Sequence, residues 1–193
     1  MFCYDLVFFR YPIKKDKYMR SILTVLALVW GCLVFGQDDI NQVDANGKKQ
    51  GHWQKKYKNG KLRYSGQFKD DMPIGIFKRY SNEGKLSSTL QYTLGTTSVV
   101  AQLFHENGKI LADGNYISQK KDSVWKFYSK NGLLFSEGNY KGGVLNGEYK
   151  EFYKNGQIHF HKFYKSGVED GALKEYYKNG NVRSKKTYNC LLY

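Results

Sequence analysis

The chain has 193 residues, a net charge of +14 and 17% aromatic residues, which is enough for one ordinary domain or one repeat array. Twenty glycines, 17 tyrosines and only two prolines favour strands and tight turns over helices. Three cysteines, two of them within the first 36 residues, exclude a disulfide framework and a cysteine-based zinc site. The charge favours attraction to anionic surfaces, although lysines on the solvated face of a sheet explain much of it equally well.

Residues 1–36 are predicted to be an N-terminal extension and a signal peptide, with Met19 as an alternative start. Four basic residues, Lys14, Lys15, Lys17 and Arg20, precede an apolar run over 22–35. This run is shorter than the roughly 20 residues that a membrane span needs, so cleavage after Gly36 or Gln37 is expected. Acylation at Cys32, as in a lipoprotein, and an uncleaved anchor are the alternatives. The predicted location is the periplasm, the outer envelope or the medium, and the charge stays near +11 after removal of residues 1–36, which hold five basic and two acidic side chains.

A 24-residue period begins after a lead-in over 37–50. It places a glycine at the same point six times, at Gly60, Gly84, Gly108, Gly132, Gly156 and Gly180. A fixed period of 20–50 residues is typical of repeat arrays, in which stacked units bury a shared apolar surface. Six units are predicted over 51–193, with the bounds 51–74, 75–98, 99–122, 123–146, 147–170 and 171–193.

The first half of each unit is expected to be a strand with large residues at unit positions three and six. Position three holds Trp53, Phe77, Ala101, Trp125, Tyr149 and Leu173, and position six holds Lys56, Tyr80, Phe104, Tyr128, Phe152 and Tyr176. A spacing of three does not fit strict alternation, so a bulge or twist is expected there.

An Asn-Gly turn and a second strand are expected to complete each unit. Asn-Gly between apolar runs predicts a type I′ hairpin turn. Positions 12, 14, 16 and 18 then alternate with polar residues, as in Leu62, Tyr64, Gly66 and Phe68, which indicates a half-buried strand. Glycine at position 16 leaves room for an aromatic ring of a neighbouring unit. The predicted fold is all-β, an elongated antiparallel array of six β-hairpins forming a solenoid or meander.

The pattern Gly-x-Trp-x-x-(Tyr/Phe)-x-x-Asn-Gly-Lys-Leu, followed by Gly-x-Tyr, resembles the bacterial variant of the MORN repeat. The best matches are Gly51 to Phe68, Ser123 to Tyr140 and Gly147 to Tyr164. With a signal peptide in front, the arrangement is similar to bacterial YwqK-family antitoxins. The resemblance implies a hairpin sheet that serves as a protein-interaction or membrane-lipid scaffold. The antitoxin label implies neutralisation of a toxin by direct binding, and an exported leader shifts this toward immunity in the envelope.

No catalytic constellation stands out, so the chain is predicted not to be an enzyme and to need no cofactor. The carboxylates are scattered through turns, and no nucleophile elbow or glycine-rich phosphate loop is present. His159 and His161 are weak metal candidates because alternate strand residues share a face, with Glu137 as a conceivable third ligand. Lys-rich aromatic stretches are typical of nucleic-acid binding, but the sheet needs the same aromatics and export argues against that partner.

The predicted function is an exported scaffold that binds a protein partner, with a toxin as one candidate. Adhesion to an anionic membrane or glycan surface through a basic sheet face is the alternative, and the oligomeric state stays open. Seven residues are expected to face outward and contact the partner: Tyr57, Arg63, Tyr153, His159, His161, Tyr177 and Arg183.

Overall fold

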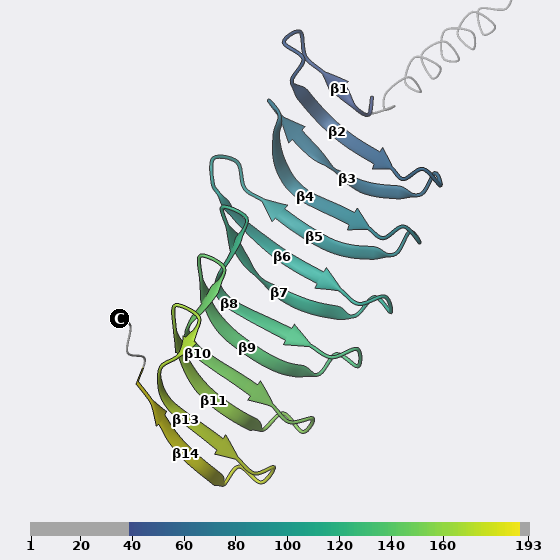
Figure 1. The fold of residues 1–193 in the computed structure, drawn as a ribbon. Coiled ribbons are helices and arrows are strands. Elements are labelled where there is room, and N and C mark those ends of the chain that lie inside the picture. Colours follow the sequence, from purple (N-terminus) through teal and green to yellow (C-terminus); the bar gives the residue numbers. More distant parts are fainter. Residues whose placement is uncertain (1–38, 190–193) are drawn as a thin grey trace, which may run out of the picture. The chain divides into compact units, whose positions relative to one another are not determined.

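The computed structural model describes residues 39–189. The predicted export signal, Cys32 and Cys190 lie outside these residues. Within them the chain forms 14 strands in one antiparallel sheet, in the order β1 to β11, β13, β14, with β12 beside β11 (Figure 1). The strands are β1 (Gln42–Val43), β2 (Lys49–Lys56), β3 (Leu62–Lys69), β4 (Met72–Tyr80), β5 (Leu86–Tyr92), β6 (Ser98–Phe104), β7 (Ile110–Ile117), β8 (Lys120–Tyr128), β9 (Leu134–Lys141), β10 (Val144–Phe152), β11 (Ile158–Lys165), β12 (Val168–Glu169), β13 (Gly171–Tyr176) and β14 (Val182–Tyr188).

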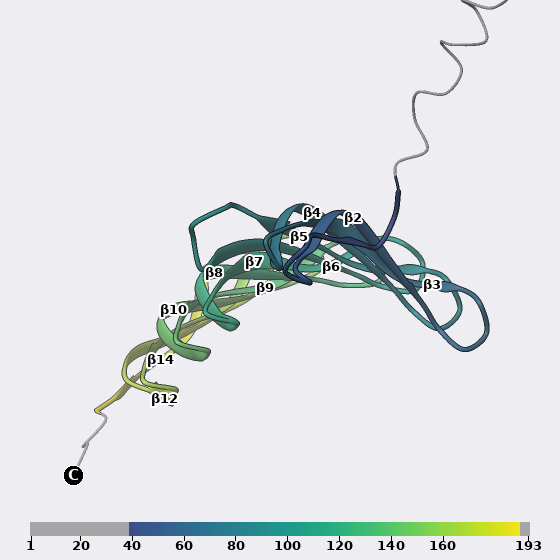
Figure 2. The same cartoon turned by 90° about the horizontal axis from the view of Figure 1, so that it is seen from above.

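The sheet is built from six successive hairpins, β2/β3, β4/β5, β6/β7, β8/β9, β10/β11 and β13/β14. Each pairs antiparallel with the next, and from above the strands of residues 39–189 form one twisted layer (Figure 2). The all-β prediction is confirmed. Residues 39–189 contain no helix with the length and hydropathy of a membrane span.

The turn prediction was wrong in one respect. In the first hairpin the Tyr57 amide donates to the Lys61 carbonyl, and the Gly60 amide donates to the Tyr57 carbonyl. Gly60 has φ +81°, whereas Asn59 is not among the residues with positive φ. A type I′ turn needs positive φ at both central residues, so this is a three-residue loop with glycine alone in the left-handed region. Pairs of positive φ occur instead in the links between hairpins, at Asp70–Asp71, Ser118–Gln119, Gly142–Gly143 and Ser166–Gly167.

The asparagines serve to join neighbouring hairpins. Asn59 accepts the Lys61 amide through Oδ1 (3.1 Å) and donates from Nδ2 to the Asn82 carbonyl of the next hairpin (2.9 Å). Asn107 and Asn155 repeat the arrangement, with donation to the Lys130 and Lys178 carbonyls. An amide side chain has both a donor and an acceptor, which explains why asparagine suits this position without any need for positive φ.

A register shift interrupts every hairpin at the same point. The bulge was expected in the first strand of each unit, but its extra residue lies in the second strand. In β2/β3, Lys55 pairs with Tyr64 but Lys56 pairs with Leu62, so Arg63 is the extra residue of a bulge. Directly paired residues share a face, and the bulge therefore places Leu62 on the face opposite Tyr64. The expectation that positions 12 and 14 face the same way was wrong.

The core lies along one face of the sheet, which we call the aromatic face. Its buried members are Phe77, Leu90, Ala101, Ala112 and Trp125, flanked by half-buried rings such as Tyr92, Tyr116 and Tyr140. A Cβ on Gly66 would lie 2.5 Å from the Phe77 ring, and one on Gly114 would lie 2.4 Å from the Trp125 ring. The prediction that these glycines make room for aromatic rings of the next hairpin is confirmed.

Candidate partner-binding face

Unit positions 5 and 13 form a row that crosses all six hairpins on the aromatic face, and we call it the 5/13 row. It consists of Lys55, Arg63, Arg79, Ser87, Leu103, Leu111, Phe127, Phe135, Glu151, His159, Glu175 and Arg183. Position 5 lies two residues beyond the buried position 3, and the bulge brings position 13 to the same face. The row therefore changes from basic to apolar to acidic along the sheet.

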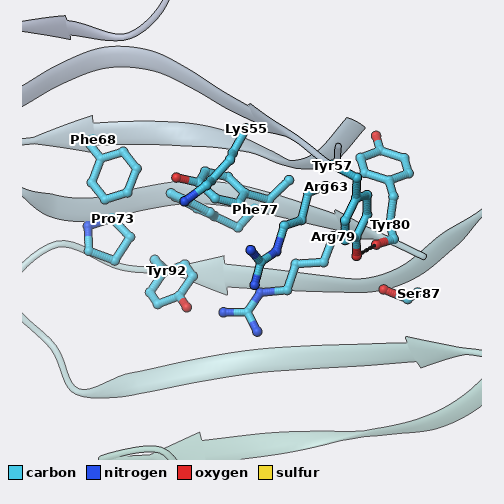
Figure 3. Close-up of a pocket in the computed structure, with 11 residues that line it drawn as sticks. Lys55, Tyr57, Arg63, Phe68, Pro73, Phe77, Arg79, Tyr80, Ser87 and Tyr92 are labelled. Carbon is cyan, nitrogen blue, oxygen red and sulfur yellow. Dashed lines mark hydrogen bonds between the residues drawn. The ribbon is translucent and has the colours of Figure 1, made fainter. Parts of the chain in front are cut away.

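The basic end of the row lines a hollow of about 520 Å³. Lys55, Arg63 and Arg79 come from the adjacent strands β2, β3 and β4, and among residues 39–189 no carboxylate lines this hollow. Their cationic ends gather between the rings of Phe68 and Tyr92 on one side and Tyr57 on the other (Figure 3). Three cations beside aromatic rings, without a lining carboxylate, favour an anionic group from outside.

The middle of the row is apolar and exposed. Phe127 and Phe135 lie with ring centroids 6.4 Å apart, and Phe135 is 47% exposed. A second hollow of about 660 Å³ lies over β4 to β7 and the link 93–97, where Leu90, Val99 and Leu103 contribute to its lining. It adjoins the first hollow, because Pro73, Arg79 and Tyr92 line both. Exposed aromatic and aliphatic surface of this kind is typical of interaction sites.

The acidic end of the row is internally neutralised. Arg183 Nη1 donates to Glu175 Oε1 (2.8 Å), and the Ser184 hydroxyl donates to Glu175 Oε2 (3.2 Å). His159 Nε2 lies 3.9 Å from the same carboxylate. Cations at this end therefore have a protein carboxylate beside them, whereas those of the first hollow do not.

Six of the seven predicted contact residues fall into three stacked pairs on the aromatic face, whereas the seventh, His161, lies on the opposite face. The Arg63 guanidinium lies 5.7 Å from the Tyr57 ring centroid, the Tyr153 and His159 rings are 4.3 Å apart, and the Arg183 guanidinium lies 5.6 Å from the Tyr177 ring centroid. In the two arginine pairs, cation–π contact orders the cationic side chain.

Two of these tyrosines also have a structural role that the sequence did not indicate. Tyr57 Oη donates to the Tyr80 carbonyl (2.8 Å), and Tyr153 Oη donates to the Tyr176 carbonyl (2.7 Å), each in the next hairpin. His105 Nε2 makes the equivalent bond to Tyr128 (2.8 Å). Tyr177 occupies the same position in the last hairpin, is 51% exposed and has no following hairpin within residues 39–189.

His159 and His161 do not share a face, so the expectation that placed these weak metal candidates on one face was wrong. Phe160 pairs with Glu151 and His161 with Lys150, while His159 is the bulge residue that joins the aromatic face. His161 lies on the opposite face with its Nε2 3.4 Å from Glu148 Oε1. Glu137, the conceivable third ligand, lies 3.6 Å from Lys150 Nζ. In the part of the chain that the structure describes, no three potential metal ligands are grouped together.

Ion pairs and burial shift several pKa values on the two faces. On the opposite face, the hydrogen bond from Lys150 lowers the pKa of Glu148 and raises that of Lys150. On the aromatic face, burial raises the pKa of the hydroxyls of Tyr116, Tyr140 and Tyr164. Burial against the Trp125, Phe127 and Tyr140 rings also lowers the pKa of Lys121. The aromatic face is therefore the less hydrated of the two around these groups.

The opposite face has an apolar stripe of its own. Ile76, Val100 and Val124 are 56%, 57% and 47% exposed and are paired across the strands with Gln91, Asn115 and Asn139. This stripe is aliphatic and alternates with amides. Rings at unit position 6, such as Tyr128 and Phe152, also lie on the opposite face but are half-buried, whereas the Phe135 ring on the aromatic face is 47% exposed, and exposed aromatic side chains dominate binding energy at interfaces. The aromatic face is the stronger candidate.

Sequence reasoning missed Lys55 and Arg79 as site residues. Reading position 5 down the six units gives Lys, Arg, Leu, Phe, Glu, Glu, which is the signal that would have found the graded row. The bulge hid the second half of the row, because strict alternation assigns position 13 to the opposite face.

A family model described as the MORN repeat variant matches residues 49–70, 99–118, 121–141, 145–166 and 169–189, more than half of the chain. The chain belongs to the MORN repeat variant family. The hairpin β4/β5 is outside the matched segments, yet it has the same pairing as the other five. MORN repeats are generally non-catalytic.

No curated protein sequence matches the chain, so the resemblance to YwqK-family antitoxins stays a prediction. Among solved structures, the chain is similar to TarM at 9% identity and a TM-score of 0.38, over 79% of this chain and 26% of that one. A mutant S. aureus TarM in complex with fondaparinux, alpha-GlcNAc-glycerol and UDP gives the same identity and TM-score, over 80% of this chain and 26% of that one. The chain spans about a quarter of these proteins.

Proposed function

We propose that this MORN repeat protein is an exported, non-catalytic scaffold that binds a protein partner through its aromatic face. The observation that carries the proposal is the 5/13 row, an exposed aromatic centre flanked by charged ends on a one-layer sheet. A sheet without a second layer leaves this surface uncovered among residues 39–189, and exposed Phe135 and Leu111 gain by burial against a partner.

Immunity to a toxin is the narrower form of this proposal. It is supported by the resemblance to YwqK-family antitoxins and by the predicted export signal. A toxin recovered as the bound partner would establish it, and a partner without toxicity would reject it.

The test is capture of partners from an envelope extract by the purified protein, at low and at moderate salt. Phe135→Asp places a charge in the centre of the aromatic face, and Val124→Asp places the same charge on the opposite face at the same 47% exposure. One protein retained by the wild type and by Val124→Asp, but lost with Phe135→Asp, supports the proposal. Retention by Phe135→Asp contradicts it.

Adhesion to an anionic membrane or glycan surface is the second candidate, favoured by the strongly positive charge. Exposed charges are screened within about 8–10 Å at physiological salt, so this function predicts steep loss of binding between low and moderate salt. Vesicles with and without anionic lipid measure it directly. Equal binding to both vesicle types would reject the adhesive function.

A further inference from the structure

The two adjoining hollows over β2 to β7 share lining residues but differ in chemistry. The first presents the cations Lys55, Arg63 and Arg79, and the second presents Leu90, Val99 and Leu103. Arg79 lines both, so a charged subsite and an apolar subsite form one continuous groove across the strands. Resting on the proposed scaffold function, we propose that this groove binds an extended partner segment with an acidic residue followed or preceded by an apolar or aromatic one.

The charged subsite fits a carboxylate. Guanidinium groups bind carboxylates through paired N–H donors, and both Arg63 and Arg79 reach the first hollow (Figure 3). No carboxylate of residues 39–189 lines the hollow, so the three like charges lack the compensation that Glu175 gives Arg183 at the other end of the row. An incoming carboxylate would relieve this repulsion, which makes its binding favourable beyond the new hydrogen bonds.

The apolar subsite fixes the spacing of the partner segment. The first hollow is centred on β3 and β4 and the second on β5 and β6, about two strand spacings further along the sheet. Two spacings of about 4.8 Å equal roughly three residues of extended chain at about 3.3 Å each. The acidic and apolar side chains of the segment are therefore expected two to four residues apart.

The lining of the second hollow favours a peptide over a lipid tail. Thr93, Thr96, Thr97 and Gln119 line it beside the aliphatic residues. Hydroxyl and amide groups can form hydrogen bonds with the backbone N–H and C=O groups of an extended peptide. An acyl chain would remove water from these hydroxyl and amide groups without forming hydrogen bonds in its place. The groove crosses the strands, so binding needs no free strand edge.

The experiment selects peptides from a displayed library of random twelve-residue sequences on the purified protein. The consensus peptide is then synthesised, and its affinity is measured for the wild type and two double variants. Arg63→Ala with Arg79→Ala removes two cations from the groove. Lys78→Ala with Lys126→Ala removes two cations from the opposite face and is the matched control.

The expected peptides carry Asp or Glu two to four residues from Leu, Phe, Tyr or Trp. Loss of both arginines is expected to weaken binding about tenfold or more, because hydrogen bonds between charged groups are lost. The control is expected to change affinity less than about twofold, and an unchanged thermal midpoint confirms that each variant is folded. Peptides without acidic residues, or equal weakening by both variants, would overturn the proposal.

Binding to anionic lipid vesicles is measured as well, for the wild type and the variants. If vesicle binding requires Arg63 and Arg79 while no acidic peptide is selected, the groove is a site for an anionic lipid and the peptide proposal is wrong. The test is separable from that of the proposed function. A partner whose capture requires Phe135 but not the two arginines would support the scaffold and reject the groove, whereas a partner indifferent to Phe135→Asp would reject the aromatic face itself.

Discussion

The two ends of the 5/13 row have the same backbone arrangement but differ in how their cationic side chains are paired. At the first two hairpins Lys55, Arg63 and Arg79 line a hollow that has no lining carboxylate in the described part of the chain. At the last two hairpins Arg183 and His159 have Glu175 beside them, at 2.8 Å and 3.9 Å. A structural role explains the second arrangement, because its charges stabilise one another. The first has no lining carboxylate to play that part, which is why we propose that a partner binds there, and the repeat supplies the comparison within one molecule.

Replacement of Trp125 by alanine should have the largest effect on stability, because Trp125 lies in the buried core between the two ends. Trp125 is fully buried, and its Nε1 donates to the Asn115 carbonyl (2.8 Å). Large-to-small substitution at such a site costs about 3–5 kcal/mol. Urea unfolding measures the loss, and Val124→Ala, at an exposed neighbour, should stay within about 0.5 kcal/mol. A loss below about 1 kcal/mol for Trp125→Ala would show that the core does not depend on this ring.

Gly66→Ala should destabilise the packing at the basic end of the row without a matching effect at the acidic end. The new Cβ would lie 2.5 Å from the Phe77 ring, which is packed edge-on against the Phe68 and Tyr92 rings. Overpacking of this kind costs about 1–3 kcal/mol. Lys162→Ala, at the same unit position near the acidic end, should cost about 1 kcal/mol or less. Equal free energies of unfolding for Gly66→Ala and the wild type would contradict the close approach.

The free energy of unfolding should respond to loss of the tyrosine hydroxyl at one end and not the other. Tyr57→Phe removes the bond to the Tyr80 carbonyl and should cost about 0.5–1.5 kcal/mol. Tyr177→Phe removes a hydroxyl that has no following hairpin to bond within residues 39–189, so the stability of this variant should stay near that of the wild type. Equal losses would mean that the bond between hairpins does not stabilise the array.

Removing a charge from each end should change the stability by a smaller amount, but it compares the two ends more directly. Glu175→Ala removes the carboxylate that binds Arg183 and Ser184, and it should destabilise the protein by about 1 kcal/mol or less. Arg79→Ala relieves repulsion within the first hollow and should leave stability unchanged or slightly higher. Thermal unfolding at low salt, where screening is weakest, measures both. A destabilised Arg79→Ala protein would show that the basic cluster is structural.

Alkaline pH should lower the free energy of unfolding through Tyr164, and this is the smallest of the expected effects. Burial raises the pKa of Tyr164 above its usual 10.0, with a further contribution from the hydrogen bond to Glu169. The unfolded chain therefore loses this proton first, so the stability is present below pH 10 and falls as pH rises above it. Unfolding at pH 8 and pH 11, in the wild type and Tyr164→Phe, isolates the effect. A pH dependence that is identical in the two proteins would contradict it.

Much of the fold followed from the sequence because the 24-residue period repeats the same local signals. Glycine at position 60 and its equivalents marked the turns. The unequal spacing of Trp53 and Lys56 indicated a bulge but placed it in the first strand, whereas the extra residue, Arg63, lies in the second. What the period could not reveal was the direction of side chains beyond that bulge. One extra residue moved Arg63 and His159 onto the aromatic face, which created the 5/13 row and separated His159 from His161. The bonds from Tyr57 and Asn59 to the next hairpin also depend on the stacking geometry, which a single unit does not show.

The most direct test of the account is photo-crosslinking from the two faces of one hairpin. A p-benzoylphenylalanine residue at position 135 samples the aromatic face, and one at position 124 samples the opposite face at the same 47% exposure. The account predicts that, in an envelope extract, position 135 captures one protein and position 124 captures none above background. Capture from position 124, with none from position 135, would place the binding surface on the aliphatic stripe and contradict the central claim.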